Sequence, residues 1–81
     1  MLPEVAEALA QFGTRVRSLR EQKGLTQEAA ASAAHLDGKH IQAIERGHAN
    51  ITLATMLGLA RGLDVPLVSL VRGIGERPKG K

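Results

Sequence analysis

Apolar residues recur every three or four positions along five separate stretches of the chain, which is the spacing of a helix with one buried face. The longest stripe consists of Val5, Leu9, Phe12, Val16 and Leu19. Helices are expected at residues 3–23, 27–33, 38–46, 53–63 and, more briefly, from 67 to 71 or 74. No stretch alternates apolar and polar residues as a strand does. The pattern therefore predicts an all-α fold of five helices.

Residues with known capping chemistry mark the ends of these helices. Thr26, Asp37 and Thr52 stand just before the second, third and fourth helices, where a side-chain oxygen can accept a hydrogen bond from a free backbone N–H. Gly24 and Gly47 follow the first and third helices, where a left-handed residue ends many helices. We therefore expect short turns between the helices.

The chain has 81 residues, the size of one domain with a core that is only just sufficient. We expect that domain at residues 12–72, with a helical extension at 1–11 and a flexible basic tail at 73–81. Gly13 lies near the first boundary and leaves open whether the residues before it continue the helix or form a separate turn. The first residue is Met and there is no room for a second module, which favours a complete small protein.

Composition excludes several classes of function. Without cysteine there are no disulfides, thiolate metal sites or thiol catalysis, which fits a reducing cytoplasm. The longest apolar run, 65–71, is too short to cross a bilayer, so no membrane partner is expected. His35, His40 and His48 lack ligand spacing and a clustered carboxylate, so no metal is expected. There is no spaced Ser, His and Asp set and no Gly-rich phosphate loop, so the chain is expected not to be an enzyme and to bind no cofactor or small molecule.

Charge and aromatic content bear on nucleic-acid binding. Eleven Lys and Arg against eight Asp and Glu give a net charge of +3, which alone is weak evidence for a polyanionic partner. The chain has no Trp or Tyr, and Phe12 falls on an apolar stripe. Because proteins that hold single strands stack bases on exposed aromatic rings, single-stranded nucleic acid is disfavoured as a partner.

Two short helices joined by a tight turn, the first with small side chains and the second polar on its outer face, are typical of a helix-turn-helix. The run GLTQEAAASAAHLDGKHIQAIERG, followed by NITLATMLGLARGLDVPLVSL, resembles the Cro/C1-type (XRE) helix-turn-helix family. The features that carry the resemblance are Arg20, Thr26-Gln27-Glu28, Ala31, Leu36, Ile41, the Ile44-Glu45-Arg46-Gly47 quartet and the Leu-rich fourth helix. The resemblance covers residues 12–70. It implies a compact, lambda-repressor-like domain whose third helix enters the major groove of double-stranded DNA.

A helical wheel of the third helix agrees with this expectation. When Ile41 and Ile44 face inward, the outward face carries base-contact candidates. These candidates are Gly38, Lys39, Gln42 and Ala43. Lys39 favours guanine and Gln42 favours adenine, while the two small residues allow close approach and Ala43 can touch a thymine methyl. An ordinary solvated helix face is the alternative.

The resemblance also implies contacts to the DNA backbone. The candidates are Thr26, Gln27, His40, Arg46 and Asn50. Gln27 heads the second helix, where free amides and the helix dipole favour an anion, and it resembles the family's phosphate clamp. Arg46 reaches a phosphate or a nearby base. Capping for Thr26 and turn formation for Asn50 are equally good interpretations.

Glu45 has a different expected role, because a carboxylate is repelled by a polyanion. In the family a matching Glu pairs with an Arg of the first helix, which here is Arg20. The resemblance therefore implies a structural ion pair between Arg20 and Glu45. If such a pair is buried, breaking it from one side costs several kcal/mol.

The sequence departs from the family at several positions. Ala30 stands where many relatives have Leu, and His35 where the turn often has Gly. The pattern LD-x-x-x-I-x-x-IERG-x-x-N also resembles controller proteins of restriction-modification systems. Those proteins often carry Arg, Thr and an aromatic residue where this chain has Gly38, Lys39 and His40. The DNA sequence that it recognises should therefore differ from theirs.

The function expected from these residues is that of a cytoplasmic, nucleoid-associated transcriptional regulator that binds palindromic operators as a homodimer. Its two recognition helices would read half-sites about 34 Å apart. The dimer interface is expected at the fifth helix, through Leu67, Leu70, Val71 and Ile74, with part of the fourth helix. Alternatively, these residues close the monomer core, and some must. The second hypothesis for function is an antitoxin-like module that holds a protein partner and regulates its own promoter.

Overall fold

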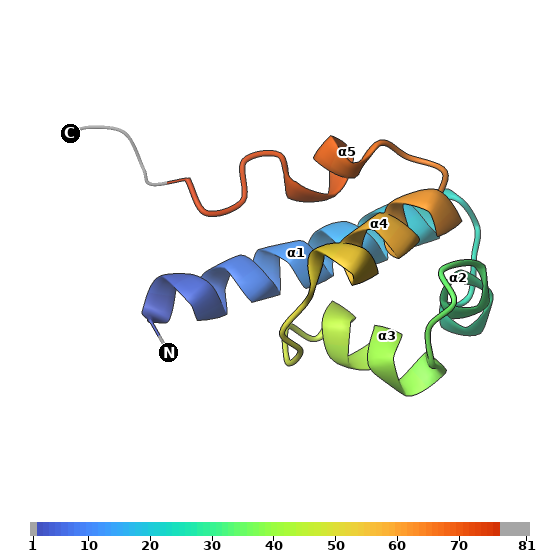
Figure 1. Cartoon of the computed structure of the whole chain (residues 1–81), viewed down its shortest axis with the longest axis horizontal. Helices are drawn as coiled ribbons and strands as arrows, with labels where there is room; N and C mark the ends of the chain where they lie inside the picture. Colours follow the sequence, from blue (N-terminus) through green and yellow to red (C-terminus); the bar gives the residue numbers. More distant parts are fainter. Residues whose placement is uncertain (1, 77–81) are drawn as a thin grey trace.

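Five helices make up the computed structural model, which describes residues 2–76 (Figure 1). They are α1 (Pro3–Gln22), α2 (Gln27–Ala33), α3 (Gly38–Glu45), α4 (Leu53–Gly62) and α5 (Leu67–Val71). The described residues contain no strand, so the prediction of an all-α, five-helix fold is confirmed. The long α1 forms the back of the molecule, with α4 in front of it, α5 above, and α2 and α3 below (Figure 1). Most of the predicted tail, residues 77–81, lies outside the described residues.

Gly13 lies inside a continuous α1, so the residues before it do not form a separate turn. Its position is buried where α1 crosses the end of α3. A Cβ atom there would touch the carbonyl oxygen of Ile44 and lie 2.7 Å from that of Glu45. The glycine that weakened the helix prediction is therefore the residue that lets the two backbones meet.

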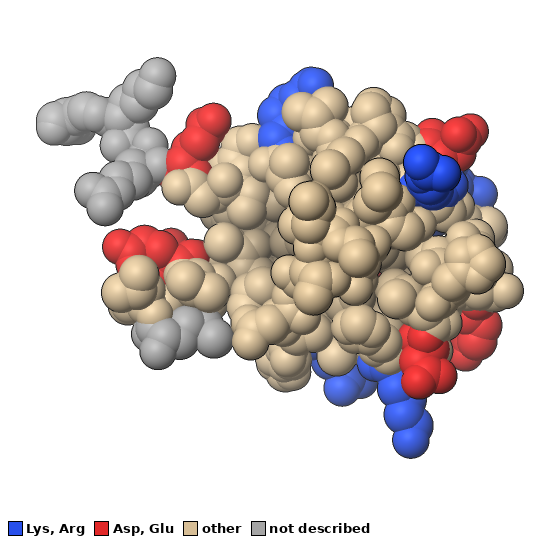
Figure 2. All heavy atoms as spheres, in the orientation of Figure 1, with Lys and Arg blue, Asp and Glu red and all other residues tan. Residues whose placement is uncertain are grey.

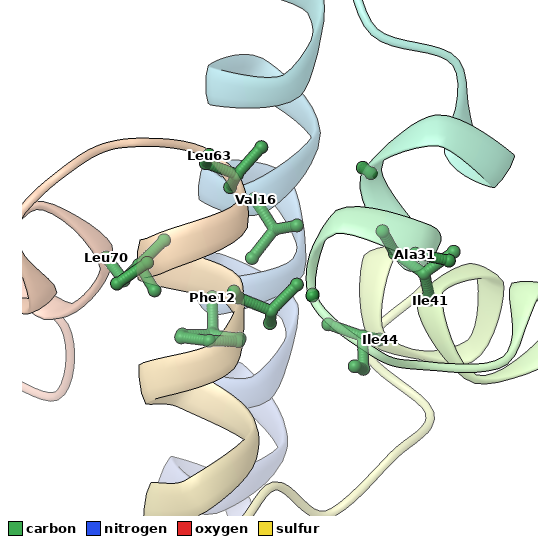
Figure 3. Close-up of a cluster of buried hydrophobic side chains, with 11 residues drawn as sticks. Phe12, Val16, Ala31, Ile41, Ile44, Leu63 and Leu70 are labelled. Carbon is green, nitrogen blue, oxygen red and sulfur yellow. The ribbon is translucent and has the colours of Figure 1, made fainter.

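The core is one cluster of buried side chains drawn from all five helices (Figure 3). Its members are Phe12, Val16, Ala30, Ala31, Ala34, Ile41, Ile44, Leu59, Ala60, Leu63 and Leu70. Ile41 and Ile44 are fully buried, as the helical wheel of α3 predicts. These two side chains fix α3 against α1 and α2 and leave its opposite side facing outward.

The small side chains of α2 are matched by small residues on α4. A Cβ atom at Gly58 would lie 3.0 Å from the carbonyl oxygen of Ala34, and one at Gly62 would lie 2.9 Å from the amide nitrogen of Ala34. The backbone of α4 therefore approaches the end of α2 closely. Ala30, on the same helix, is also buried in the core, at 1% exposure.

The caps agree with the sequence at two helices and not at the third. Thr26 accepts a hydrogen bond from Ala29 N at 3.0 Å, and Thr52 accepts one from Thr55 N at 3.0 Å. Asp37 occupies the N-cap of α3, but its side chain accepts no capping hydrogen bond, so that prediction is wrong. The backbone at His35 has φ = 60°, which is the left-handed turn conformation that the sequence places there.

The end of α3 is one residue earlier than predicted. The helix ends at Glu45, with Arg46 as its C-cap residue and Gly47 at φ = +77° immediately after it. Glycine adopts this left-handed conformation without steric cost, so it ends the helix there. Arg46 therefore lies at the end of the helix rather than within its last turn.

Arg15 attaches α5 to α1, a contact that the sequence analysis missed. Its Nη1 donates to the carbonyl oxygen of Ser69 at 2.8 Å, and its Nη2 donates to that of Arg72 at 2.9 Å. The last carbonyls of a helix have no partner within the helix. The guanidinium of Arg15 supplies donors for two of the carbonyls at the end of α5.

The prediction of an interface at Leu70 is wrong, because this side chain belongs to the core of one protomer. Leu70 is 0% exposed, and Leu67 and Ile74 pack against the same core. Leu67 and Leu70 are spaced by three on α5 and share its inward side, and Ile74 reaches the same core from the segment after the helix. Of the four predicted interface residues, Val71 is on the outward side, where it is joined by Val68.

Candidate nucleic-acid interface

The outward side of α3, hereafter the α3 face, carries the four base-contact candidates Gly38, Lys39, Gln42 and Ala43. Lys39 is exposed and the other three are partly exposed. A Cβ atom at Gly38 would have no neighbour within 4 Å, so packing inside the protomer does not require glycine there. Lys and Arg side chains project from the edge of the molecule where α3 lies, with acidic side chains beside them (Figure 2). The α3 face is therefore open to a ligand and bears donors.

A hollow of about 530 Å³ lies next to this face, at the meeting point of α1, α2 and α3. It is lined by Arg17, Arg20, Thr26, Gln27, Gln42, Glu45 and Arg46. Three arginines and one glutamate make its lining net positive. Arg17 is exposed and forms an ion pair with Glu21, which is also exposed, at 3.1 Å. The sequence analysis missed Arg17, although its spacing of three from Arg20 places it near the same side of α1.

Arg20 and Glu45 form a partly buried ion pair with two hydrogen bonds at the base of the hollow. Arg20 Nε donates to Glu45 Oε2 at 2.7 Å, and Nη2 donates to Oε1 at 3.1 Å. Arg20 Nη1 also donates to the carbonyl oxygen of Leu25 at 2.8 Å. The two side chains are 11% and 4% exposed. The hydrogen bond with Glu45 raises the pKa of Arg20 above its ordinary value, outweighing the opposite effect of burial.

Gln27 joins this pair. Its Nε2 donates to Glu45 Oε1 at 3.0 Å. One carboxylate therefore binds a side chain from α1 and another from the first turn of α2. This arrangement holds the Gln27 side chain in place and leaves its own carbonyl oxygen and one N–H available for a ligand.

The structure brings together some of the predicted backbone contacts and separates others. Thr26, Gln27 and Arg46 line the hollow beside Gln42. The hydroxyl of Thr26 is used as the cap of α2. His40 and Asn50 lie outside the hollow, His40 partly exposed on α3 and Asn50 exposed in the segment before α4.

Other classes of site have no support in the part of the chain that the structure describes. Within residues 2–76 there is no group of three His, Cys, Asp or Glu side chains placed to hold a metal ion. No helix in that range is long and apolar enough to span a membrane.

The family of the chain follows from its match to a protein-family model. Residues 16–70 match the helix-turn-helix model HTH_3, which corresponds to the Cro/C1-type (XRE) proteins. The chain belongs to this family. Its members are regulators of transcription and not enzymes. The helix-turn-helix of this chain is formed by α2 and α3, as its sequence predicted.

Relatives agree with that assignment. The chain is 37% identical over 68 residues to the uncharacterised HTH-type transcriptional regulator y4dJ of Sinorhizobium fredii, covering 84% of this chain and 88% of y4dJ. It is also similar to the crystal structure of the restriction-modification controller protein C.AhdI from Aeromonas hydrophila. The identity is 42% and the TM-score 0.75, over 76% of this chain and 94% of C.AhdI.

A second controller protein, C.Esp1396I, has been solved as a tetramer in complex with its natural 35-base-pair operator. The identity is 32% and the TM-score 0.73, over 78% of this chain and 83% of that one. These likenesses confirm the predicted resemblance to restriction-modification controllers in both sequence and fold.

Proposed function

We propose that this helix-turn-helix protein is a sequence-specific regulator that inserts α3 into the major groove of duplex DNA. The observation that carries the proposal is the two-sidedness of α3. Ile41 and Ile44 are fully buried, whereas on the α3 face a Cβ atom at Gly38 would have no neighbour within 4 Å. The major groove accepts an α-helix whose outer side chains reach base edges. Lys39 and Gln42 are the donors for guanine and adenine, and Ala43 is the apolar contact for a thymine methyl.

Phosphate contacts would come from the rim of the hollow beside α3. Gln27 and Arg46 are the principal candidates, with Arg17 as an addition from the structure. Thr26, His40 and Asn50 remain weaker candidates for the DNA backbone. Such contacts position the protein and supply salt-dependent affinity, but they carry no sequence information.

A homodimer on a palindromic operator extends this proposal. One helix reads only a few base pairs, and two copies related by a two-fold axis would read half-sites about one helical turn apart. The candidate interface is now the α4–α5 face, which we define as Leu53, Leu57, Val68 and Val71, all exposed. Its centre, over α4, is free of charged side chains (Figure 2). Such a protein would act on the nucleoid, in the cytoplasm.

The experiment that tests DNA binding is selection of bound duplexes from a random pool with the wild-type chain. An enriched palindrome supports DNA reading and dimer symmetry together. Failure to enrich any sequence over repeated rounds overturns the proposal of sequence-specific binding.

The selected duplex then allows a test of the α3 face. Lys39→Ala should weaken binding to that duplex by about 1–3 kcal/mol and to a scrambled duplex much less, because a base contact is lost. Lys23→Ala removes the same charge outside the α3 face and should weaken both duplexes slightly and equally. Affinities are measured by fluorescence anisotropy at one salt concentration. Equal losses at both duplexes for Lys39→Ala would make Lys39 a backbone contact.

A further inference from the structure

The apolar stripe of α1 continues past the edge of the protomer. Phe12 and Val16 are buried in the core and Leu9 is partly buried, but Val5 is 38% exposed and Leu2 is 65% exposed. Because α1 is continuous, its first turns keep the direction set by its buried part. The start of α1 therefore extends past α3 and α4 (Figure 1), and its apolar side chains Leu2 and Val5 are exposed there.

We propose that this projecting start of α1, residues 2–9, docks on a second copy of the chain and completes the dimer interface. The inference rests on the homodimer proposed above. The six large hydrophobic side chains that are exposed among the described residues lie in only three places. They are Leu2 and Val5 at the start of α1, Leu53 and Leu57 on α4, and Val68 and Val71 on α5.

The size of the α4–α5 face supports a contribution from α1. A specific interface takes about 20–30 residues from each partner. The two helices have ten and five residues, and Leu59, Ala60 and Leu70 among them are buried in the protomer. The outward residues of these helices are therefore too few for a stable dimer, and the uncovered stripe of α1 is the remaining exposed apolar surface.

The charges at the start of α1 favour a second copy of the chain, rather than DNA, as its partner. Glu4 and Glu7 are exposed on the same two turns of α1 and would repel a polyanion. Arg61 and Arg72, at the ends of α4 and α5, are exposed, and the exposed acidic residues of this region, Asp64 and Glu76, lie in the segments that follow these helices. A two-fold axis that lays α1 of one copy along α4 and α5 of the other brings opposite charges to the rim of the contact.

The test uses the full-length chain and a matched pair of substitutions. Val5→Glu places a charge on the stripe, and Ala6→Glu places the same charge one residue later, about 100° around the helix. A glutamate in the first turn of a helix is favoured by the helix dipole, so neither change should fray α1. Circular dichroism should show the same helix content and thermal midpoint for the monomer of all three proteins.

Sedimentation velocity over a range of concentrations gives the dimer dissociation constant. We expect Val5→Glu to raise it roughly tenfold or more, as truncation of a buried interface anchor does, and Ala6→Glu to leave it nearly unchanged. Amide hydrogen exchange gives a second measurement, because protection of residues 2–9 should rise with protein concentration in the wild type and not in Val5→Glu.

A third variant, Val68→Glu, separates this inference from the homodimer proposal. If Val68→Glu dissociates the dimer and Val5→Glu does not, the docking of α1 is overturned and the homodimer stands. If the wild type sediments as a monomer at every concentration and on its operator, both proposals are overturned.

Discussion

Different interactions hold the α3 face and the α4–α5 face of this molecule in place. Behind the α3 face, Arg20, Gln27 and Glu45 tie three helices together by hydrogen bonds of 2.7 to 3.1 Å. The helices that carry the α4–α5 face contribute apolar residues such as Leu59 and Leu70 to the core, and Arg15 donates hydrogen bonds to backbone carbonyls at the end of α5. The α3 face is held by an ion pair between side chains, whereas the α4–α5 face is held by apolar packing and by hydrogen bonds to the backbone of α5.

The difference separates two kinds of mutational effect. A change in the network behind α3 leaves a partly buried charge without its partner, so we expect it to act on the fold and on the proposed DNA binding together. An outward change on the α4–α5 face leaves the protomer intact, so we expect it to act only on the proposed dimer. Paired substitutions, one at a buried or networked position and one at an exposed position nearby, test this division.

The largest expected effect is that of Leu70→Asp. This side chain is fully buried, and an unpaired carboxylate in that place should cost more than about 4 kcal/mol, enough to unfold a domain of this size. Circular dichroism should show loss of helix. Val68→Asp, two residues earlier and 48% exposed, should leave a folded monomer. A folded, monomeric Leu70→Asp protein would return Leu70 to the dimer interface.

Leu70 also shows which property could not be predicted from the sequence: whether an apolar side chain packs inside the protomer or against a partner. Its spacing with Leu67 and Ile74 identifies one apolar side of the fifth helix, but spacing alone does not say whether that side meets its own core or a partner. The answer depends on where α5 lies against α1, and the hydrogen bonds from Arg15 that fix it join residues 54 and 57 positions apart. Long-range contacts of this kind leave no periodic signal in the sequence.

Local features were predicted better. The helices, the caps at Thr26 and Thr52 and the left-handed turn at His35 follow from residues within one turn of each site. Gly13 made a continuous first helix look less certain, because glycine lowers helix propensity. In the structure, glycine is needed at this position because the backbone at the distant end of α3 lies against it. The pairing of Arg20 with Glu45 was accessible only through resemblance to the family, and the contact of Gln27 with Glu45 was not anticipated at all.

The second prediction concerns that network. Glu45→Ala should lower the free energy of unfolding by about 1.5–3 kcal/mol, because Arg20 keeps its charge in a partly buried place and loses two charged hydrogen bonds. Urea unfolding measures the loss. The control is Arg17→Ala, which breaks the exposed pair with Glu21 without removing a partner of Arg20 and should cost about 0.3–0.5 kcal/mol.

A double variant, Arg20→Met with Glu45→Leu, sharpens the result. Replacing both charges by apolar groups should recover much of the loss, since no unpaired charge remains. The same variant releases Gln27 and should still weaken DNA binding. If the double variant is as unstable as Glu45→Ala alone, the cost lies in packing rather than in the buried charge.

The smallest effects are expected from two glycines, and they should have opposite signs. Gly13→Ala should destabilise the fold by about 1–3 kcal/mol, because its methyl group would meet the backbone of α3. Gly38→Ala should stabilise it by up to about 1 kcal/mol, because the site has open space, no positive φ and a helical conformation that alanine favours. Thermal unfolding of the two variants beside the wild type measures both changes.

Gly38→Ala also tests whether the α3 face binds DNA. The added methyl group points into the space that a DNA base would approach, so the more stable protein should bind its selected duplex more weakly. If the substitution raises the stability of the fold and lowers the affinity for DNA, the reason for glycine at position 38 lies in a ligand outside the protomer. If Gly38→Ala binds as tightly as the wild type, the start of α3 does not approach the bases closely, and readout depends on Gln42 and Ala43 further along the helix.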